Sequence, residues 1–467
     1  MKYENNKVSD IKIAYIGGGS RGWAWVFMGD LSQEAQLGGT IALYDIDRDA
    51  AKQNEKLGNM ISAKNEAVGK WNYKCADTLS EALTGADFVV ISILPGTFDE
   101  MDSDVHLPER VGIYQPVGDT AGPGGIIRSL RTIPMIAEIA KAVREYAPKA
   151  WVINYTNPMS ICIKTLYHTF PEIKAFGCCH EVFGTQKMLM EILKKTHGLT
   201  EINRHDIIVN VLGINHFTWF DYASYKGIDL FPLYSDFISK NFESGISEKS
   251  EHWANSVFNS MNRVKFDLFK KYGYIAAAGD RHLAEFVDSN LYLKDPETVK
   301  SWHFSLTTVN WRKQDLKERQ EKARRLVSGE ESLTLKDSGE EGVLLIKALC
   351  GLSQVVSNVN IPNTAKQIGN LPAPAIVETN AVFSRDSIRP VFAGDMPEAL
   401  LNLTLPHVNN HDTVLKAALT CDKDLVICAF EADPLIGSKV SKTELSKLAT
   451  DMIKNTQKYL PEGWIET

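Results

Sequence analysis

The sequence predicts an α/β protein in which a Rossmann-type, doubly wound parallel sheet is followed by a second, mixed α+β domain. Strand-like and helix-like segments alternate regularly through the first 200 residues. The run DFVVISIL, residues 87–94, is almost wholly apolar, as expected for a strand buried on both faces. In addition, 467 residues exceed the length at which one hydrophobic core usually stops growing.

The predicted elements of the first part follow a regular order. IKIAYIG, residues 11–17, is a β-rich run that ends at glycines, and the segment after it has apolar residues at helical spacing. Further strands are predicted at 40–47, 72–76, 87–94, 151–156 and 173–178. Helices are predicted at 48–68, 78–86 and 125–146, after Pro158, and at 182–197.

Beyond residue 200 the pattern becomes mixed, so we predict two domains, residues 1–200 and 201–467. The second has strand-like segments near 207–225. Its helices are predicted around 253–272, 312–327, 340–351 and 411–420.

Composition and charge exclude several classes of function. The net charge of −7 argues against a nucleic-acid partner. The polar start MKYENNKVSD lacks the apolar core of a secretory signal, and no later run approaches the roughly 20 apolar residues of a membrane span. The seven cysteines are odd in number and irregularly spaced, which argues against a disulfide framework. We therefore expect a cytoplasmic protein without a membrane partner.

Gly17, Gly19 and Gly22 form a G-x-G-x-x-G motif between a predicted strand and a predicted helix. The first glycine allows a tight turn, and the second lets the backbone approach a pyrophosphate. The helix start supplies free N–H groups. The motif predicts a dinucleotide site, with a glycine turn that holds no nucleotide as the alternative.

Polar side chains near this turn favour NAD as the dinucleotide. Asp45 ends the second predicted strand, close to where an acid would accept hydrogen bonds from the adenosine ribose, and it would repel the phosphate of NADP. Asp47 is a rival for this role. Ser20 adds a hydroxyl to the predicted phosphate cradle, and we also assign Asn154 to the cofactor site.

Cys179 and His216 are candidate metal ligands. Both residues lie at predicted strand ends, so a thiolate and an imidazole can converge on one ion across the cleft. Two protein ligands would leave coordination positions open for substrate. A C-H dipeptide with a distant histidine also occurs by chance, so ordinary packing is the alternative.

Taken together, the motifs resemble those of the family 4 glycoside hydrolases, which use NAD and a divalent metal and share their nucleotide domain with lactate and malate dehydrogenases. The resemblance spans most of the chain. Its segments are IAYIGGGS, VGDTAGPGGIIRSLRTIP (117–134), NYTNPMSI (154–161), CCHEV (178–182), GINHF (213–217) and NIPNTAKQIGNLPAPAIVE (360–378). CHEV, which begins at Cys179, is similar to the branch that acts on α-galacturonides and unlike the phosphorylated-sugar members.

The resemblance implies that Cys179 and His216 hold the metal. The family is associated with manganese, whereas thiolate and imidazole are ligands that softness rules would assign to zinc or a late transition metal. We predict manganese, and the sequence leaves the metal open.

The resemblance also implies substrate and base residues. Asn157 of the NP motif is a sugar contact, and Asp280 is the candidate base, with Tyr272 and Tyr274 as rivals. We add Asn215, beside the predicted histidine ligand, as a further substrate contact.

The mechanism that the resemblance implies joins redox chemistry to elimination. Hydride leaves C3 of the sugar for NAD, the C2 hydrogen becomes acidic, a base removes it, and the aglycone departs from C1. Water then adds and the hydride returns. Asp119 and His180 are candidate proton donors, and their alternatives are a loop-capping aspartate and a histidine that only orients Cys179.

A uronic acid substrate needs a cation for its carboxylate, and we predict Arg281 for this role, with His282 nearby. Pairing of Arg281 with Asp280 or Glu285 is the alternative. The expected partner is a small oligosaccharide with an α-linked uronic acid, and relatives imply a homodimer or homotetramer. Other readings are an α-galactosidase or α-glucuronidase of the same family, a 2-hydroxy acid dehydrogenase, or a non-catalytic NAD sensor.

Overall fold

The structure is a computed structural model that describes residues 1–247, 260–336, 338–437 and 439–464. Its largest sheet has ten strands among these residues. The strands are β1 (Lys2–Glu4), β2 (Lys7–Ile16), β3 (Leu37–Tyr44), β4 (Lys70–Cys75), β5 (Phe88–Ile91), β6 (Trp151–Asn154), β7 (Lys174–Gly177), β12 (Val355–Pro362), β13 (Ile376–Ser384) and β14 (Ser387–Pro390). Their order is β14-β13-β12-β7-β6-β5-β2-β3-β4, with β1 beside β2.

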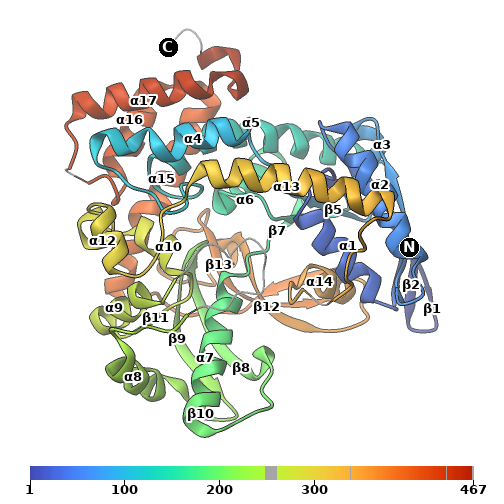
Figure 1. The fold of residues 1–467 in the computed structure, drawn as a ribbon, viewed down its shortest axis with the longest axis horizontal. Coiled ribbons are helices and arrows are strands. Elements are labelled where there is room, and N and C mark those ends of the chain that lie inside the picture. Colours follow the sequence, from blue (N-terminus) through green and yellow to red (C-terminus); the bar gives the residue numbers. More distant parts are fainter. Residues whose placement is uncertain (248–259, 337, 438, 465–467) are drawn as a thin grey trace.

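The strands β2 to β7 form a parallel, Rossmann-like sheet, which confirms the predicted fold class. All four residues of β5 are buried, as the apolar run predicted, although the strand ends at Ile91. Helices separate the strands along the chain (Figure 1). These helices are α1 (Trp23–Gln33), α2 (Arg48–Ala63), α3 (Leu79–Leu83), α4 (Phe98–His106), α5 (Gly122–Tyr146), α6 (Met159–Thr169) and α7 (Glu181–His197).

Later parts of the chain extend this sheet. Strand β12 runs antiparallel to β7, with Asn360 opposite Gly177, and β13 and β14 continue the antiparallel pairing. The helix α14 (Gly342–Leu349) contacts α1 from the first part. Strands from both sides of residue 200 thus share one sheet, and the division into two domains at that residue stays a prediction.

A second, smaller sheet lies in the lower lobe of the molecule in Figure 1. It contains β8 (Ile207–Ile214), β9 (Phe217–Tyr225), β10 (Ile228–Asp229) and β11 (Ile275–Ala276), and α8 (Leu230–Asn241) packs beside β9. The strands predicted at 207–225 are therefore confirmed as a β8–β9 hairpin. Its turn consists of Asn215 and His216, and His216 has a left-handed φ of 64°.

The remaining helices pack mostly on other helices of the fold. They are α9 (Arg263–Tyr272), α10 (Asp280–Leu283), α11 (Ser289–Tyr292), α12 (Pro296–Ser301), α13 (Val309–Ser328), α15 (Glu398–Thr420), α16 (Lys423–Ala432) and α17 (Lys442–Thr456). Of the helix predicted at 253–272, residues 253–259 lie outside the described residues. Helix α15 begins well before the predicted residue 411 and contains Pro406. A proline normally interrupts a helix, and here buried side chains on both sides of it keep the helix packed on the core.

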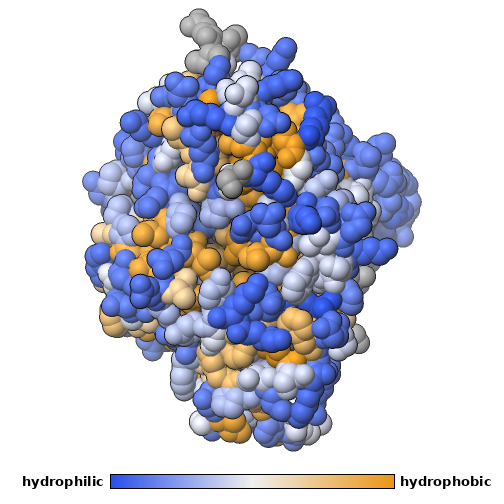
Figure 2. All heavy atoms as spheres, turned by 90° about the vertical axis from the view of Figure 1, so that its left-hand side faces the viewer, coloured by the Kyte–Doolittle hydropathy of each residue, from blue (hydrophilic) through white to orange (hydrophobic). Residues whose placement is uncertain are grey.

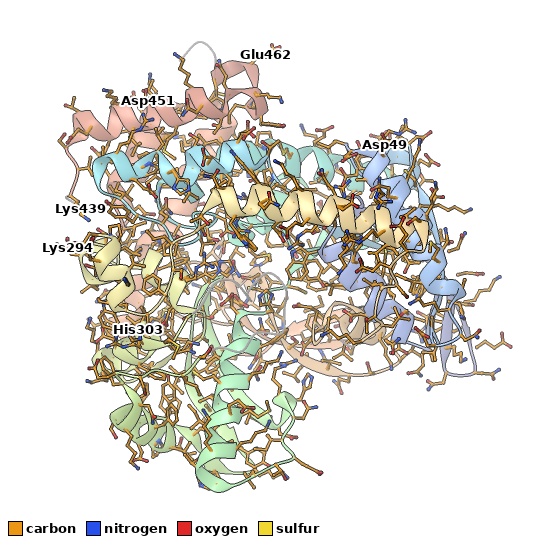
Figure 3. All side chains as sticks on the ribbon, viewed as in Figure 1. Asp49, Lys294, His303, Lys439, Asp451 and Glu462 are labelled. Atoms are coloured by element: carbon orange, nitrogen blue, oxygen red, sulfur yellow. The ribbon has the colours of Figure 1, made fainter. Side chains whose placement is uncertain are left out.

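The C-terminal helices are tied to the rest of the fold. Lys439, after α16, donates hydrogen bonds to the carbonyl oxygens of Gly112 (3.1 Å) and Lys294 (3.3 Å). Figure 3 shows Lys439 and Lys294 close together at the edge of the molecule. None of the helices within the described residues combines the length and the apolar character needed to cross a lipid bilayer.

Candidate active site

The predicted nucleotide turn joins β2 to α1. Gly17 has a φ of 92°, and a Cβ there would lie 2.0 Å from the carbonyl oxygen of Ser92. A Cβ on Gly19 would lie 2.7 Å from the Cβ of Ala50. Gly22 caps α1 without a side-chain hydrogen bond, so the first N–H groups of the helix stay available. This geometry is that of a backbone cradle for a phosphate.

Asp45 is built into the same turn. Its Oδ2 accepts a hydrogen bond from the amide of Gly19 (2.8 Å), and its Oδ1 accepts one from the amide of Asp47 (2.9 Å). Burial raises the pKa of Asp45. The rival Asp47 instead caps α2, where its carboxylate accepts from the amide of Ala50 (3.1 Å). Both carboxylates thus accept hydrogen bonds from backbone amides, and the assignment of the ribose contact to Asp45 stays a prediction.

Two other residues assigned to the cofactor are engaged with the protein. The carbonyl oxygen of Ser20 accepts from Asn54 Nδ2 (2.9 Å), which fixes the turn. Asn154 ends β6, is fully buried, and exchanges hydrogen bonds with the backbone of Thr156 (2.9 and 3.2 Å). Asn154 shapes the bend after β6, and its contact with a cofactor stays a prediction.

Asp119, His216 and His282 form a cluster of possible metal ligands, whose donor atoms all lie within 4.8 Å of one another. The two imidazole rings are 3.7 Å apart between centroids. Asp119 precedes α5, His216 is in the β8–β9 turn and His282 is in α10. Three distant segments therefore converge on one point, and the sequence offered no spacing rule for this set.

The groups in this cluster have the protonation states that a cation requires. Burial, followed by His282, lowers the pKa of His216 to about 3, so this imidazole is neutral. Burial also lowers the pKa of His282. Burial acts to raise the pKa of Asp119, but His282, His216 and Arg128 outweigh it and hold that pKa well below its usual value.

Thr120 links two members of the cluster. Its hydroxyl donates to Asp119 Oδ1 (2.7 Å) and lies 3.0 Å from His216 Nδ1. Since the hydroxyl proton is used on Asp119, His216 Nδ1 must be the donor in the second contact. That tautomer leaves His216 Nε2 as the lone-pair nitrogen for a metal.

Cys179 lies after β7 and close to Asn215, the residue that precedes His216. Its thiol is surrounded by Asn215, Glu378 and Glu181, and burial followed by the two carboxylates raises its pKa well above the usual value. Its carbonyl oxygen accepts from Asn358 (3.2 Å). Cys179 is not a member of the three-residue cluster within the described part of the chain, and its role as a ligand with His216 stays a prediction.

His180 connects the cluster to the nucleotide turn. Its ring lies 5.8 Å, between centroids, from that of Trp23, the first residue of α1. His180 Nδ1 lies 3.6 Å from Glu340, and Nε2 lies 3.9 Å from Glu181. Glu181 in turn lies 3.7 Å from His282 Nε2.

The remaining predicted residues have contrasting surroundings. Asn157 Nδ2 donates to Asp119 Oδ2 (3.3 Å), so the predicted sugar contact lies next to the cluster. Asp280 is fully buried, and its Oδ1 accepts from the amide of Lys265 (3.0 Å). Tyr272 and Tyr274 pack, partly buried, against the hydrophobic core. The assignment of the base among these three stays a prediction.

Asn215 and Arg281 both contact other protein groups. Asn215 Nδ2 donates to Glu378 (3.3 Å). The guanidinium of Arg281 donates to the carbonyl oxygens of Ser305 (3.1 Å) and Pro116 and to Thr307 (2.6 Å). Their contacts with substrate stay predictions.

Sequence reasoning missed several carboxylates and a hydroxyl of this site. The missed residues are Glu181, Glu378, Glu340 and Thr120. Glu181 and Glu378 lie inside segments on which the family resemblance rests, and that position was the available signal that they belong to the site. Burial raises the pKa of Glu378 to about 7, and Asn358 donates to its carboxylate (2.6 Å).

Comparisons with known proteins agree with this geometry. The model for family 4 glycosyl hydrolases matches residues 12–195, and that for the family's C-terminal domain matches residues 211–436. An α-galacturonidase of Lachnoclostridium phytofermentans is 66% identical over 464 residues, which cover 99% of this chain and 100% of that protein.

Solved structures extend the comparison. The crystal structure of a Bacillus subtilis protein that is 52% identical has a TM-score of 0.89 and covers 95% of this chain and 100% of that one. A 6-phospho-α-glucosidase from gut microorganisms, solved with NAD and Mn²⁺, shares the fold at 18% identity and a TM-score of 0.78, over 98% of this chain and 99% of that one. On the two family matches and the full-length relative, this chain belongs to family 4 of the glycosyl hydrolases.

Proposed function

We propose that the protein is an NAD- and manganese-dependent α-galacturonidase. The observation that supports this proposal is that the nucleotide turn and the cluster of Asp119, His216 and His282 lie near each other. His180 lies between them. Ordinary glycosidases need only two carboxylates, and NAD-dependent family 4 enzymes are an exception to that rule. The choice of sugar follows the similar α-galacturonidase and the CHEV motif at Cys179.

We propose that His216, Asp119 and His282 hold the divalent cation, with Cys179 as a further ligand. The residues fit: His216 is neutral, and His282 Nδ1 is buried without a hydrogen-bond partner among the described residues. The carboxylate of Asp119 adds a hard oxygen, which suits manganese better than thiolate and imidazole alone. When bound, the cation supplies Lewis acidity at the C2 and C3 positions of the sugar.

We propose that the turn from Gly17 to Gly22 and the carboxylate of Asp45 bind NAD. The fit lies in the close approaches at Gly17 and Gly19, which leave no room for a side chain, and in the open N-terminus of α1. When bound, NAD supplies the hydride acceptor. The carboxylate of Asp45 favours NAD over its phosphorylated form, because the two negative charges would repel each other.

The chain's own residues divide the proton transfers. His180, half-buried between Trp23 and Glu181, is the better candidate for protonating the leaving group. Asp119 suits the ligand role more than the donor role, because its pKa is held too low for it to carry a proton at neutral pH. Asp280 remains the proposed base that removes the C2 proton.

A panel of nitrophenyl α-glycosides, incubated with protein, NAD, Mn²⁺ and reductant, tests this function. We expect cleavage of the α-galacturonide with catalytic NAD, no net NADH, and deuterium at C2 of the sugar released in deuterated water. A 2-hydroxy acid dehydrogenase would instead consume NAD stoichiometrically. Faster cleavage of the α-galactoside or α-glucuronide would reassign the substrate within the family.

We also propose that the enzyme works in the cytoplasm as a homodimer or homotetramer. A reducing compartment keeps Cys179 available as a ligand. Figure 2 shows hydrophobic residues on one face of the molecule with hydrophilic residues around them, as at many subunit interfaces. Light scattering coupled to gel filtration measures the mass, and a monomer would contradict the proposal.

A further inference from the structure

Arg281, the residue that the sequence favoured for the substrate carboxylate, is engaged with the protein. Its Nε donates to the carbonyl oxygen of Ser305 (3.1 Å), and its Nη2 donates to Thr307 (2.6 Å) and to the carbonyl oxygen of Pro116. These bonds hold the segment that leads to Asp119. A substrate carboxylate would have to compete with several protein acceptors at once.

Arg128 is a second arginine at the same site, near the start of α5. The residue is only 7% exposed, and its Nε donates to the carbonyl oxygen of Asn157 (3.1 Å). Across residues 1–247, 260–336, 338–437 and 439–464, no protein group accepts a hydrogen bond from its two terminal nitrogens. Those nitrogens are not sealed from solvent, which leaves them open to a small oxygen ligand. The ionised carboxylate of Asp119 is one negative charge close to this guanidinium, and the terminal N–H groups remain available to bind a second anion.

Asn157 joins Arg128 to the proposed metal ligands. Its Nδ2 lies 3.3 Å from Asp119 Oδ2, while its Oδ1 is buried without a hydrogen-bond partner among the described residues. A sugar hydroxyl would satisfy that oxygen. A sugar ring at Asn157 would therefore lie near both the proposed cation and the guanidinium of Arg128.

We infer that Arg128 determines specificity by binding the C6 carboxylate of the galacturonide through its terminal N–H groups. A planar guanidinium can form two parallel, charge-assisted hydrogen bonds to a carboxylate. The inference rests on the proposed function. In this assignment Arg281 acts as a positioning residue, because it secures the loop that carries Asp119.

The test compares the binding of D-galacturonate and D-galactose to the NAD- and Mn²⁺-loaded protein by calorimetry. Arg128→Gln should weaken galacturonate binding by about 100-fold more than galactose binding, because only galacturonate loses two hydrogen bonds between charged groups. Arg281→Gln is the matched control, and it should weaken both sugars alike because it loosens the Asp119 loop. Kinetics on the two nitrophenyl glycosides should show the same change in preference.

Arg128→Lys covers the case in which Arg128→Gln does not fold. Lysine keeps the positive charge but lacks the planar guanidinium that forms two parallel hydrogen bonds, so Arg128→Lys should retain part of the preference for galacturonate. The inference is overturned if an Arg128 variant weakens both sugars equally, or if Arg281→Gln alone removes the preference. If the wild-type protein neither prefers galacturonate nor cleaves the galacturonide, the proposed function itself fails, which is a separate result.

Discussion

At the scale of single residues, the site depends on charge states that burial imposes. His216 is neutral and Asp119 is ionised, although they lie side by side, and Thr120 links them. The thiol of Cys179 keeps its proton in these surroundings, and a cation close to it would lower its pKa. Metal affinity should therefore depend on single hydroxyl, imidazole and thiol groups.

Thr120→Val should weaken manganese binding about tenfold or more, because second-sphere partners of metal ligands contribute on this scale. The variant keeps the shape of the side chain and removes the bridge to Asp119 and His216. Titration calorimetry with Mn²⁺ measures the change. Thr165→Val, which removes a buried hydroxyl from α6, serves as the control and should leave affinity unchanged.

Cys179→Ser should lower both manganese content and activity, because serine cannot supply a thiolate. For the same reason, wild-type activity should fade in air and return with reductant and metal. Metal analysis by mass spectrometry and a glycosidase assay check both statements. Cys428→Ser changes an exposed thiol in α16 and should have no effect. Full metal content and activity in Cys179→Ser would remove this residue from the metal site.

At the scale of elements, one loop positions the cluster and one turn forms the proposed cofactor site. The residues before Asp119 are held by Arg281 and by Glu285, which accepts from the amides of Val117 (2.6 Å) and Gly118 (2.9 Å). From the other side, Asp433 accepts from the amide of Gly122 (3.0 Å). The loop is thus fixed from both sides before any ligand binds.

Glu285 gives this loop a dependence on pH. Burial raises its pKa from 4.5 to about 8, so folding takes up a proton between those values. The stability that this proton provides is present below about pH 4.5 and is lost as pH rises through about 8. The melting temperature of wild-type protein, measured without ligands, should therefore fall over this range relative to that of Glu285→Gln. Parallel curves for the two proteins would show that Glu285 keeps an ordinary pKa.

Gly17→Ala should abolish detectable NAD binding. The methyl group would lie 2.0 Å from the carbonyl oxygen of Ser92, at a φ of 92° that suits glycine. Fluorescence titration with NAD measures the loss. Gly29→Ala, in the middle of α1 with nothing within 4 Å of the new atom, should bind NAD normally and raise stability by about 0.5–1 kcal/mol. Normal NAD binding by Gly17→Ala would place the cofactor elsewhere.

At the scale of the whole molecule, one sheet edge collects groups from the entire chain. Strands β2, β6, β7, β12 and β13 all belong to one ten-stranded sheet among the described residues. The site uses the turn after β2, the ends of β6 and β7, and the paired strands β12 and β13. The smaller sheet adds His216 through its hairpin turn. Ligands that bridge these parts should stabilise the molecule as a unit.

NAD and Mn²⁺ together should raise the melting temperature more than the sum of their separate effects. Each ligand stabilises the native state by about 2.7 kcal/mol at a concentration of 100 Kd. Because His180 links the two sites, ordering by one should reduce the cost of binding the other. Differential scanning calorimetry with and without chelator checks this, and strictly additive shifts would mean that the sites are independent.

The sequence by itself determined the parallel sheet, the nucleotide turn and the family. These features depend on neighbouring residues: an apolar run such as 87–94, or glycines at fixed spacing, has the same physical meaning wherever it occurs. It also paired Cys179 with His216 as candidate metal ligands, and it named Asp119 only as a candidate proton donor. It named His282 only as a candidate substrate contact. The predicted start of α15 was too late. Proline has a low helix propensity, so Pro406 argues against a helix in the sequence, whereas the packing that keeps this segment helical exists only in the folded protein.

Only the tertiary structure decided which side chains meet. Asp119 and His282 lie near His216 because a loop, a short helix and a hairpin turn from three parts of the chain converge, and no local pattern encodes that distance. The same holds for the two arginines, since Arg281 is occupied by backbone carbonyls while Arg128 keeps its terminal nitrogens accessible. Hydrogen-bond partners and burial are set by the packed fold, and they determine the charge and availability of each group.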